Sequence, residues 1–86
     1  MRARVYVTLK PSVFDPQGRV VAEALTSLGY GDVKDVRQGK FFEVELEGSD
    51  PLTARARVTE MADRLLANPV IESYRVEISD EGAAGR

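Results

Sequence analysis

The chain has 86 residues, of which 43% are hydrophobic and 30% are charged, and its formal net charge is −2. This length fits one small domain, and the charge is opposite in sign to that of most proteins that bind a phosphate backbone. Because the chain contains no cysteine and no histidine, it lacks thiol and imidazole nucleophiles and the usual zinc ligands. We therefore expect no catalytic residue, no metal site and no bound cofactor in this chain.

The first predicted element is a strand at residues 3–10, where apolar and polar side chains alternate with a period of two. A helix is predicted next, because Asp15 is a good N-cap and Pro16 suits the first helical position. Apolar residues then recur at helical spacing as far as Gly29, which ends the helix.

A short second strand is predicted at residues 33–37, with weak alternation of the kind seen in edge strands. The pair Gln38-Gly39 indicates a tight turn. A third strand is predicted at residues 41–47, where Phe42, Val44 and Leu46 alternate with polar or aromatic neighbours.

The pair Asp50-Pro51 repeats the helix start found at the first helix. This second helix is predicted to end at Asn68-Pro69, because asparagine tolerates a left-handed backbone and proline cannot continue a helix. A fourth strand is predicted at residues 73–78, where alternation returns.

The predicted order β-α-β-β-α-β is that of a ferredoxin-like α+β fold. It implies a four-stranded antiparallel sheet with two helices on one face and an uncovered opposite face. We expect residues 1–78 to form this single domain and residues 79–86, which are polar and rich in glycine and alanine, to form a flexible tail.

The uncovered sheet face offers three interpretations. Three glutamates alternate along the third strand, at positions 43, 45 and 47, which would suit an acid–base or magnesium site but fits a solvated face better. Tyr6 and Phe41 could stack RNA bases, yet the neighbouring carboxylates would repel phosphates. We favour an interface whose centre is Tyr6 and Phe41, and we expect a homodimer or tetramer because so small a domain gains stability by association.

Four collinear strings resemble the PurS family, the small subunits of phosphoribosylformylglycinamidine synthase. They are residues 5–13 with 15–18, residues 28–30, residues 33–37 with 39–40, and residues 65–72 with 74–75. The resemblance covers residues 3–78, and it implies a non-catalytic accessory subunit of purine biosynthesis. The implied partners are a PurQ-type glutaminase, which releases ammonia, and a PurL-type synthetase, which binds ATP and magnesium.

The resemblance implies that the chain bridges these two subunits and assists ammonia transfer. Polar residues within the matched strings are the candidate partner contacts: Lys10, Asp15, Gln17, Arg37, Lys40, Asn68 and Arg75. The alternative that we keep is an ACT-like regulatory domain that binds a small molecule as a dimer. No apolar run is long enough to span a membrane and no signal segment is evident, so we expect a cytoplasmic protein with no membrane or nucleic-acid partner.

Overall fold

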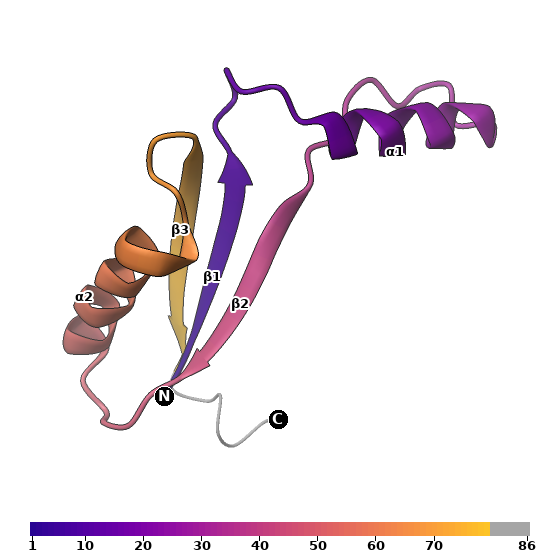
Figure 1. Cartoon of the computed structure of the whole chain (residues 1–86). Helices are drawn as coiled ribbons and strands as arrows, with labels where there is room; N and C mark the ends of the chain where they lie inside the picture. Colours follow the sequence, from indigo (N-terminus) through magenta and orange to yellow (C-terminus); the bar gives the residue numbers. More distant parts are fainter. Residues whose placement is uncertain (80–86) are drawn as a thin grey trace.

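The computed structural model describes residues 1–79 as an α+β protein with one antiparallel sheet (Figure 1). The strands are β1 (Arg2–Leu9), β2 (Gly39–Glu45) and β3 (Glu72–Ser79), in the spatial order β2-β1-β3. The helices are α1 (Pro16–Ser27) and α2 (Pro51–Met61), and α2 continues into a short π-helical turn, η1 (Ala62–Leu66). The predicted α+β class is confirmed.

The core lies between the sheet and α2, as the period-two pattern of β1 predicts. Ala3, Val5 and Val7 are buried and point toward α2, which contributes the fully buried Val58, and η1 adds Ala62. Since alternate residues of a strand point to opposite faces, the other face of β1 carries Arg2, Arg4 and Tyr6.

The predicted strand at residues 33–37 is wrong: within residues 1–79 the sheet has three strands, not four. Val33 and Val36 are half-buried while their neighbours are exposed, so the apolar spacing is three rather than two. The Val36 carbonyl oxygen lies so close to Gly18 that a Cβ on this glycine would be 2.1 Å away. The segment therefore packs along α1 instead of joining the sheet.

The prediction of two helices on one sheet face is also wrong. Figure 1 shows α2 over the sheet, whereas α1 lies beyond the end of the strands. Residues 10–38 thus form a projection, which we call the arm. The radius of gyration is 16.2 Å, compared with about 12 Å for a compact chain of this length. The ferredoxin-like arrangement is therefore not formed within the single chain.

Both predicted helix starts are confirmed. The carboxylate of Asp15 accepts a hydrogen bond from the Gly18 N–H, and that of Asp50 accepts one from the Leu52 N–H. The reason given for the end of the second helix was wrong, since no non-glycine residue among residues 1–79 has a positive φ. Asn68 acts instead through its side-chain oxygen, which accepts a hydrogen bond from the Val70 N–H at 3.1 Å.

Strand β3 continues through Ser79, the first residue of the predicted tail, and the other tail residues, 80–86, lie outside the described part of the chain. Within residues 1–79, no helix is long and apolar enough to cross a membrane.

A candidate partner-binding surface

The centre of the uncovered sheet face is an aromatic pair. Tyr6 on β1 is directly opposite Phe41 on β2 and Arg75 on β3. The ring centroids of Tyr6 and Phe41 are 5.1 Å apart, and the Arg75 guanidinium carbon lies 4.1 Å from the Tyr6 ring centroid. Phe41 keeps 52% of its surface exposed. Three of the predicted surface residues therefore form one cluster with an accessible apolar ring.

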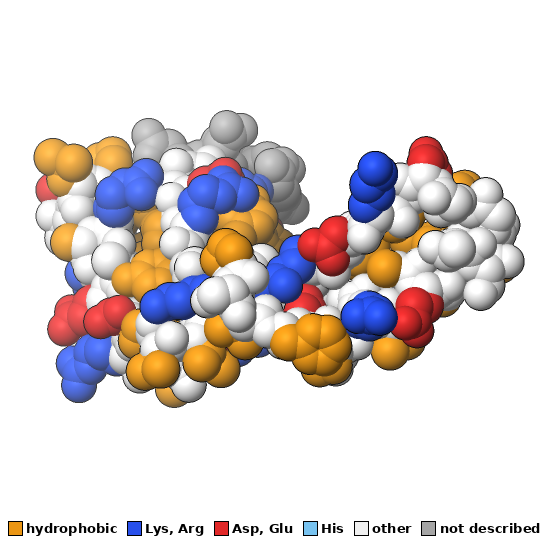
Figure 2. Space-filling view, turned by 90° about the horizontal axis from the view of Figure 1, so that it is seen from above, with side chains coloured by type: hydrophobic (Ala, Val, Ile, Leu, Met, Phe, Trp, Pro, Cys, Tyr) orange, Lys and Arg blue, Asp and Glu red, His pale blue; other side chains and the backbone are white. Residues whose placement is uncertain are grey.

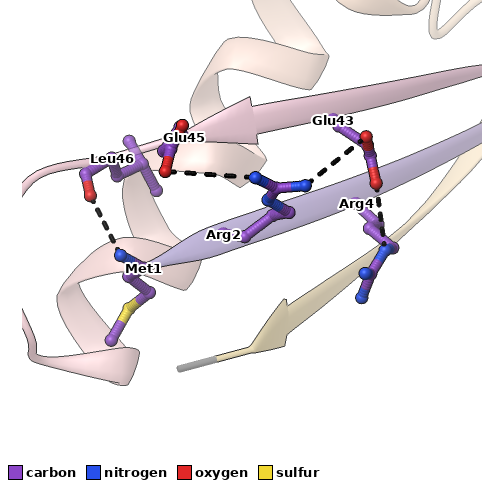
Figure 3. Close-up of polar contacts among 6 residues, drawn as sticks. All are labelled: Met1, Arg2, Arg4, Glu43, Glu45 and Leu46. Carbon is purple, nitrogen blue, oxygen red and sulfur yellow. Dashed lines mark hydrogen bonds and ion pairs between the residues drawn. The ribbon is translucent and has the colours of Figure 1, made fainter. Parts of the chain in front are cut away.

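Ion pairs extend from this centre along the strands (Figure 3). Arg2 lies 3.7 Å from Glu43 and 4.0 Å from Glu45, and Arg4 lies 3.5 Å from Glu43, measured between nitrogen and carboxylate oxygen. Cross-strand pairs of opposite charge stabilise a sheet modestly. Two of the three alternating glutamates thus neutralise arginines, and residues 1–79 contain no cluster of acidic side chains that could hold a metal ion.

Glu77 completes the polar rim of the aromatic pair. Its carboxylate accepts hydrogen bonds from the Arg75 guanidinium and from the Tyr6 hydroxyl. These two donors stabilise the ionised form and hold the pKa of Glu77 below its ordinary value. The face therefore presents an aromatic centre surrounded by paired charges, a composition that fits an interface.

The second group of predicted residues lies at the base of the arm. Asp15 is 6% exposed, and its two carboxylate oxygens accept hydrogen bonds from the N–H groups of Gly18 at 2.9 Å and Gln38 at 2.8 Å. These bonds hold the pKa of Asp15 below its ordinary value, with a smaller contribution from the Arg37 charge. The Gln38 side chain donates to the Gln17 oxygen at 2.7 Å.

Arg37 is used within the same chain. One guanidinium nitrogen donates to the backbone oxygens of Leu9, Lys10 and Val13, at 3.3, 2.9 and 3.0 Å. Lys10 is half-buried, and its backbone N–H donates to the Ile71 oxygen at 2.8 Å. The structure therefore gives both predicted residues an internal role at the base of the arm.

Lys40 and Asn68 meet at Glu72, the first residue of β3. One carboxylate oxygen of Glu72 lies 3.5 Å from the Lys40 ammonium nitrogen, and the other accepts a hydrogen bond from the Asn68 N–H at 2.7 Å. An open depression of about 350 Å³ lies between this corner and the base of the arm, where Asp15 and Gln17 also line it. Three of the predicted residues, Asp15, Gln17 and Lys40, thus share one hollow.

Sequence reasoning missed Gln38 and Glu72 because both are linked to their partners by tertiary contacts. One feature of the sequence does point to a tertiary contact at this place. Gly18 lies near the start of a predicted helix, where a glycine lowers helix stability. A glycine at such a position indicates that another chain segment approaches closely.

The arm exposes a row of large apolar side chains. On α1 and beside it, the exposed fractions are 64% for Val20, 39% for Val21 and 74% for Leu28, and Phe14 and Tyr30 are more than half exposed. Within α1, Gly18 is the one residue that is buried. Figure 2 shows the arm as a separate lobe joined to the rest by a narrow waist. Exposed apolar patches of this kind mark interaction surfaces.

Comparison with known proteins gives consistent similarities. The model of the family described as PurS, phosphoribosylformylglycinamidine (FGAM) synthase, matches residues 2–80. The PurS subunit of the enzyme from Synechocystis is 52% identical over 93% of this chain and 81% of its own length. The structure of PurS from Bacillus subtilis is 49% identical and covers 92% of this chain and 98% of its own, with a TM-score of 0.81. A chain in the structure of PurLQS from Thermotoga maritima is 30% identical, with a TM-score of 0.81 over 88% of this chain and 93% of its own.

Proposed function

Because the chain belongs to the PurS family of FGAM synthase subunits in purine biosynthesis, we propose that it is a non-catalytic accessory subunit that bridges a PurQ-type glutaminase and a PurL-type synthetase. The observation that carries the proposal is the similarity to a chain of PurLQS from Thermotoga maritima. It works in the cytoplasm with these two protein partners.

The chemistry of the complex resides in the partners. A glutaminase needs a nucleophile such as a cysteine thiol, and this sequence contains neither cysteine nor histidine. In the described residues, Glu43 and Glu45 pair with arginines, and the carboxylates of Asp15 and Asp50 cap the two helices. ATP and magnesium therefore bind the synthetase, and this chain contributes surfaces.

Two separate surfaces support a bridging role. One is the hollow edged by Gln17 and Lys40, and the other is the uncovered sheet face at Arg75. They lie on different parts of an elongated molecule, whose principal extents are 48 × 32 × 15 Å. A bridge needs at least two binding areas. Lys40 and Arg75 are predicted partner contacts whose side chains are more than half exposed.

The chain self-associates as a homodimer or tetramer. In the single chain, α1 leaves its own sheet, and its apolar row stays exposed. Burial of an apolar helix face is the main gain that a small domain obtains from association. The arm of one copy packs on a second copy, and Tyr6 with Phe41 forms a further contact between copies.

Holding the two enzymes together assists ammonia transfer. Ammonia released into water is largely protonated and then cannot attack an electrophile, so confinement between neighbouring sites protects its reactive form. A stable adaptor that fixes the distance between these sites raises the effective concentration of ammonia at the synthetase.

Reconstitution of the three subunits tests the proposal. FGAM formation is measured with glutamine and, separately, with ammonium salt as the nitrogen source, in the presence and absence of this chain. Omission of the chain should abolish most glutamine-driven turnover and leave ammonium-driven turnover by the synthetase intact. Equal glutamine-driven rates with and without the chain would contradict the bridging role.

A further inference from the structure

The direction of the arm depends on the two chain segments that join it to the sheet. The first, residues 10–15, leaves β1, and the second, residues 36–38, returns to β2. Figure 1 shows that α1 extends away from the sheet beyond these crossings. Contacts between the crossing segments therefore set where the exposed row of α1 points.

We propose that Asp15 and Arg37 form a latch that locks the two crossing segments together and fixes the direction of the arm. In each half of the latch, a side chain on one segment bonds to the backbone of the other segment. Asp15 on the first segment accepts a hydrogen bond from the Gln38 N–H on the second. Arg37 on the second segment donates to the backbone oxygens of Lys10 and Val13 on the first.

A matched residue in the same chain shows that the Gln38 bond is not needed to start a helix. Asp50 precedes Pro51 as Asp15 precedes Pro16, and it caps α2 through the Leu52 N–H and the Thr53 hydroxyl. Both of its bonds stay within the first turn. Asp15 makes the local bond to Gly18 and uses its second oxygen for a residue 23 positions away.

Close packing under the latch supports a rigid attachment. The Val36 carbonyl oxygen lies against Gly18, where a Cβ would be 2.1 Å from that oxygen. Asp15 is 6% exposed, its bond to Gly18 is buried and its bond to Gln38 is partly buried, and hydrogen bonds shielded from water are stronger. The arm is thus attached rigidly to the sheet. The proposed association of α1 with another copy needs the arm in one orientation.

Asparagine at position 15 separates the two roles of the aspartate. The amide oxygen of Asp15→Asn still accepts the Gly18 N–H, but its NH2 group faces the Gln38 N–H, so the cap is kept and the latch is broken. Arg37→Met removes the other half while keeping an apolar stem of similar length. Asp50→Asn is the control, because the Thr53 hydroxyl can turn and accept from the new amide.

The experiment measures the distance between spin labels on the arm and on α2. Labels are placed at Asp32→Cys and Arg57→Cys, both exposed, in a chain with no other cysteine. Excess unlabelled chain ensures that each measured distance lies within one copy. The parent and Asp50→Asn should give one narrow distance distribution, and Asp15→Asn and Arg37→Met should give broad or shifted ones with unchanged circular dichroism.

Narrow, unshifted distributions for both Asp15→Asn and Arg37→Met would overturn the latch. The measurement needs neither partner subunit, so its failure is distinct from failure of the bridging role. If the arm also mediates self-association, which belongs to the proposed function, the two latch variants should raise the dissociation constant of the oligomer several-fold through lost preorganisation, and Asp50→Asn should leave it unchanged.

Discussion

The hydroxyl of Tyr6 donates a hydrogen bond to the Glu77 carboxylate 3.1 Å away, although the two residues are 71 positions apart in the sequence. The bond crosses from β1 to β3 on the sheet face that α2 leaves free. The same carboxylate is bound by Arg75, which covers the Tyr6 ring. The aromatic pair and its polar rim are therefore one connected unit.

Removal of the Tyr6 hydroxyl should lower the stability of the protein slightly and keep the aromatic packing. Tyr6→Phe keeps the ring against Phe41 and under Arg75 but leaves Glu77 with one donor fewer. We expect the melting temperature to fall by a few degrees, because such a bond contributes modestly to stability. Tyr30→Phe, on the exposed arm, is the control and should melt like the parent. Equal melting of all three proteins would show that the Tyr6 bond adds nothing.

How much of this structure local patterns predict depends on the range of the interactions. The caps at Asp15 and Asp50 involve neighbours within three positions, so the Asp-Pro pairs suffice to predict both helix starts. The placement of Tyr6 and Phe41 on the uncovered face follows from the period of two, and the structure adds that they are directly opposite. These parts of the fold and of the surface could be read from the chain.

The direction of the arm could not be predicted in this way. It depends on the bond between Asp15 and Gln38 and on the three carbonyls around Arg37, which are tertiary contacts without a local pattern. The apolar spacing of Val33 and Val36 fits packing against α1, yet in so short a segment it also resembles an edge strand. Asp15 and Arg37, which were predicted to contact partners, therefore make hydrogen bonds at the base of the arm instead.

Acid should destabilise the fold through carboxylates that are hydrogen-bonded as anions. Asp15 and Glu77 have pKa values below their ordinary values of 3.8 and 4.5, and depressed native pKa values stabilise the folded state above the ordinary pKa. This stability is lost as the pH falls through the native pKa values. Urea unfolding should give equal midpoints at pH 7 and 6 and lower midpoints below about pH 4.5.

Glu77→Gln provides the check on that pH dependence. The amide cannot ionise, so the midpoint of this variant should fall less between pH 6 and 3 than that of the parent. Glu23→Gln is the matched control, since Glu23 forms only an exposed pair with Arg19 and such pairs contribute little. A parent slope retained in full by Glu77→Gln would exclude a contribution from this carboxylate.

A charge in the exposed row of α1 should weaken self-association. Val21→Asp places a carboxylate in the apolar row, and burying an unpaired charge in a contact costs several kcal/mol. The dissociation constant measured by sedimentation should therefore rise at least about tenfold. Leu52→Asp makes a comparable change at a residue that is 79% exposed on α2 and should have a much smaller effect. An unchanged oligomer in Val21→Asp would exclude α1 from the contact.

Gly18→Ala should raise stability through helix propensity and lower it through a steric clash. In an exposed helix, replacement of glycine by alanine stabilises by up to about 1 kcal/mol, but the Cβ of Gly18→Ala would lie 2.1 Å from the backbone oxygen of Val36. A backbone atom cannot swing aside as a side chain can, so the segment must shift, at a cost of about 1–3 kcal/mol. Urea unfolding should show net destabilisation. Gly31→Ala, whose Cβ would meet no atom within 4 Å, should be neutral, and a Gly18→Ala variant as stable as Gly31→Ala would mean that α1 and the returning segment are not in contact.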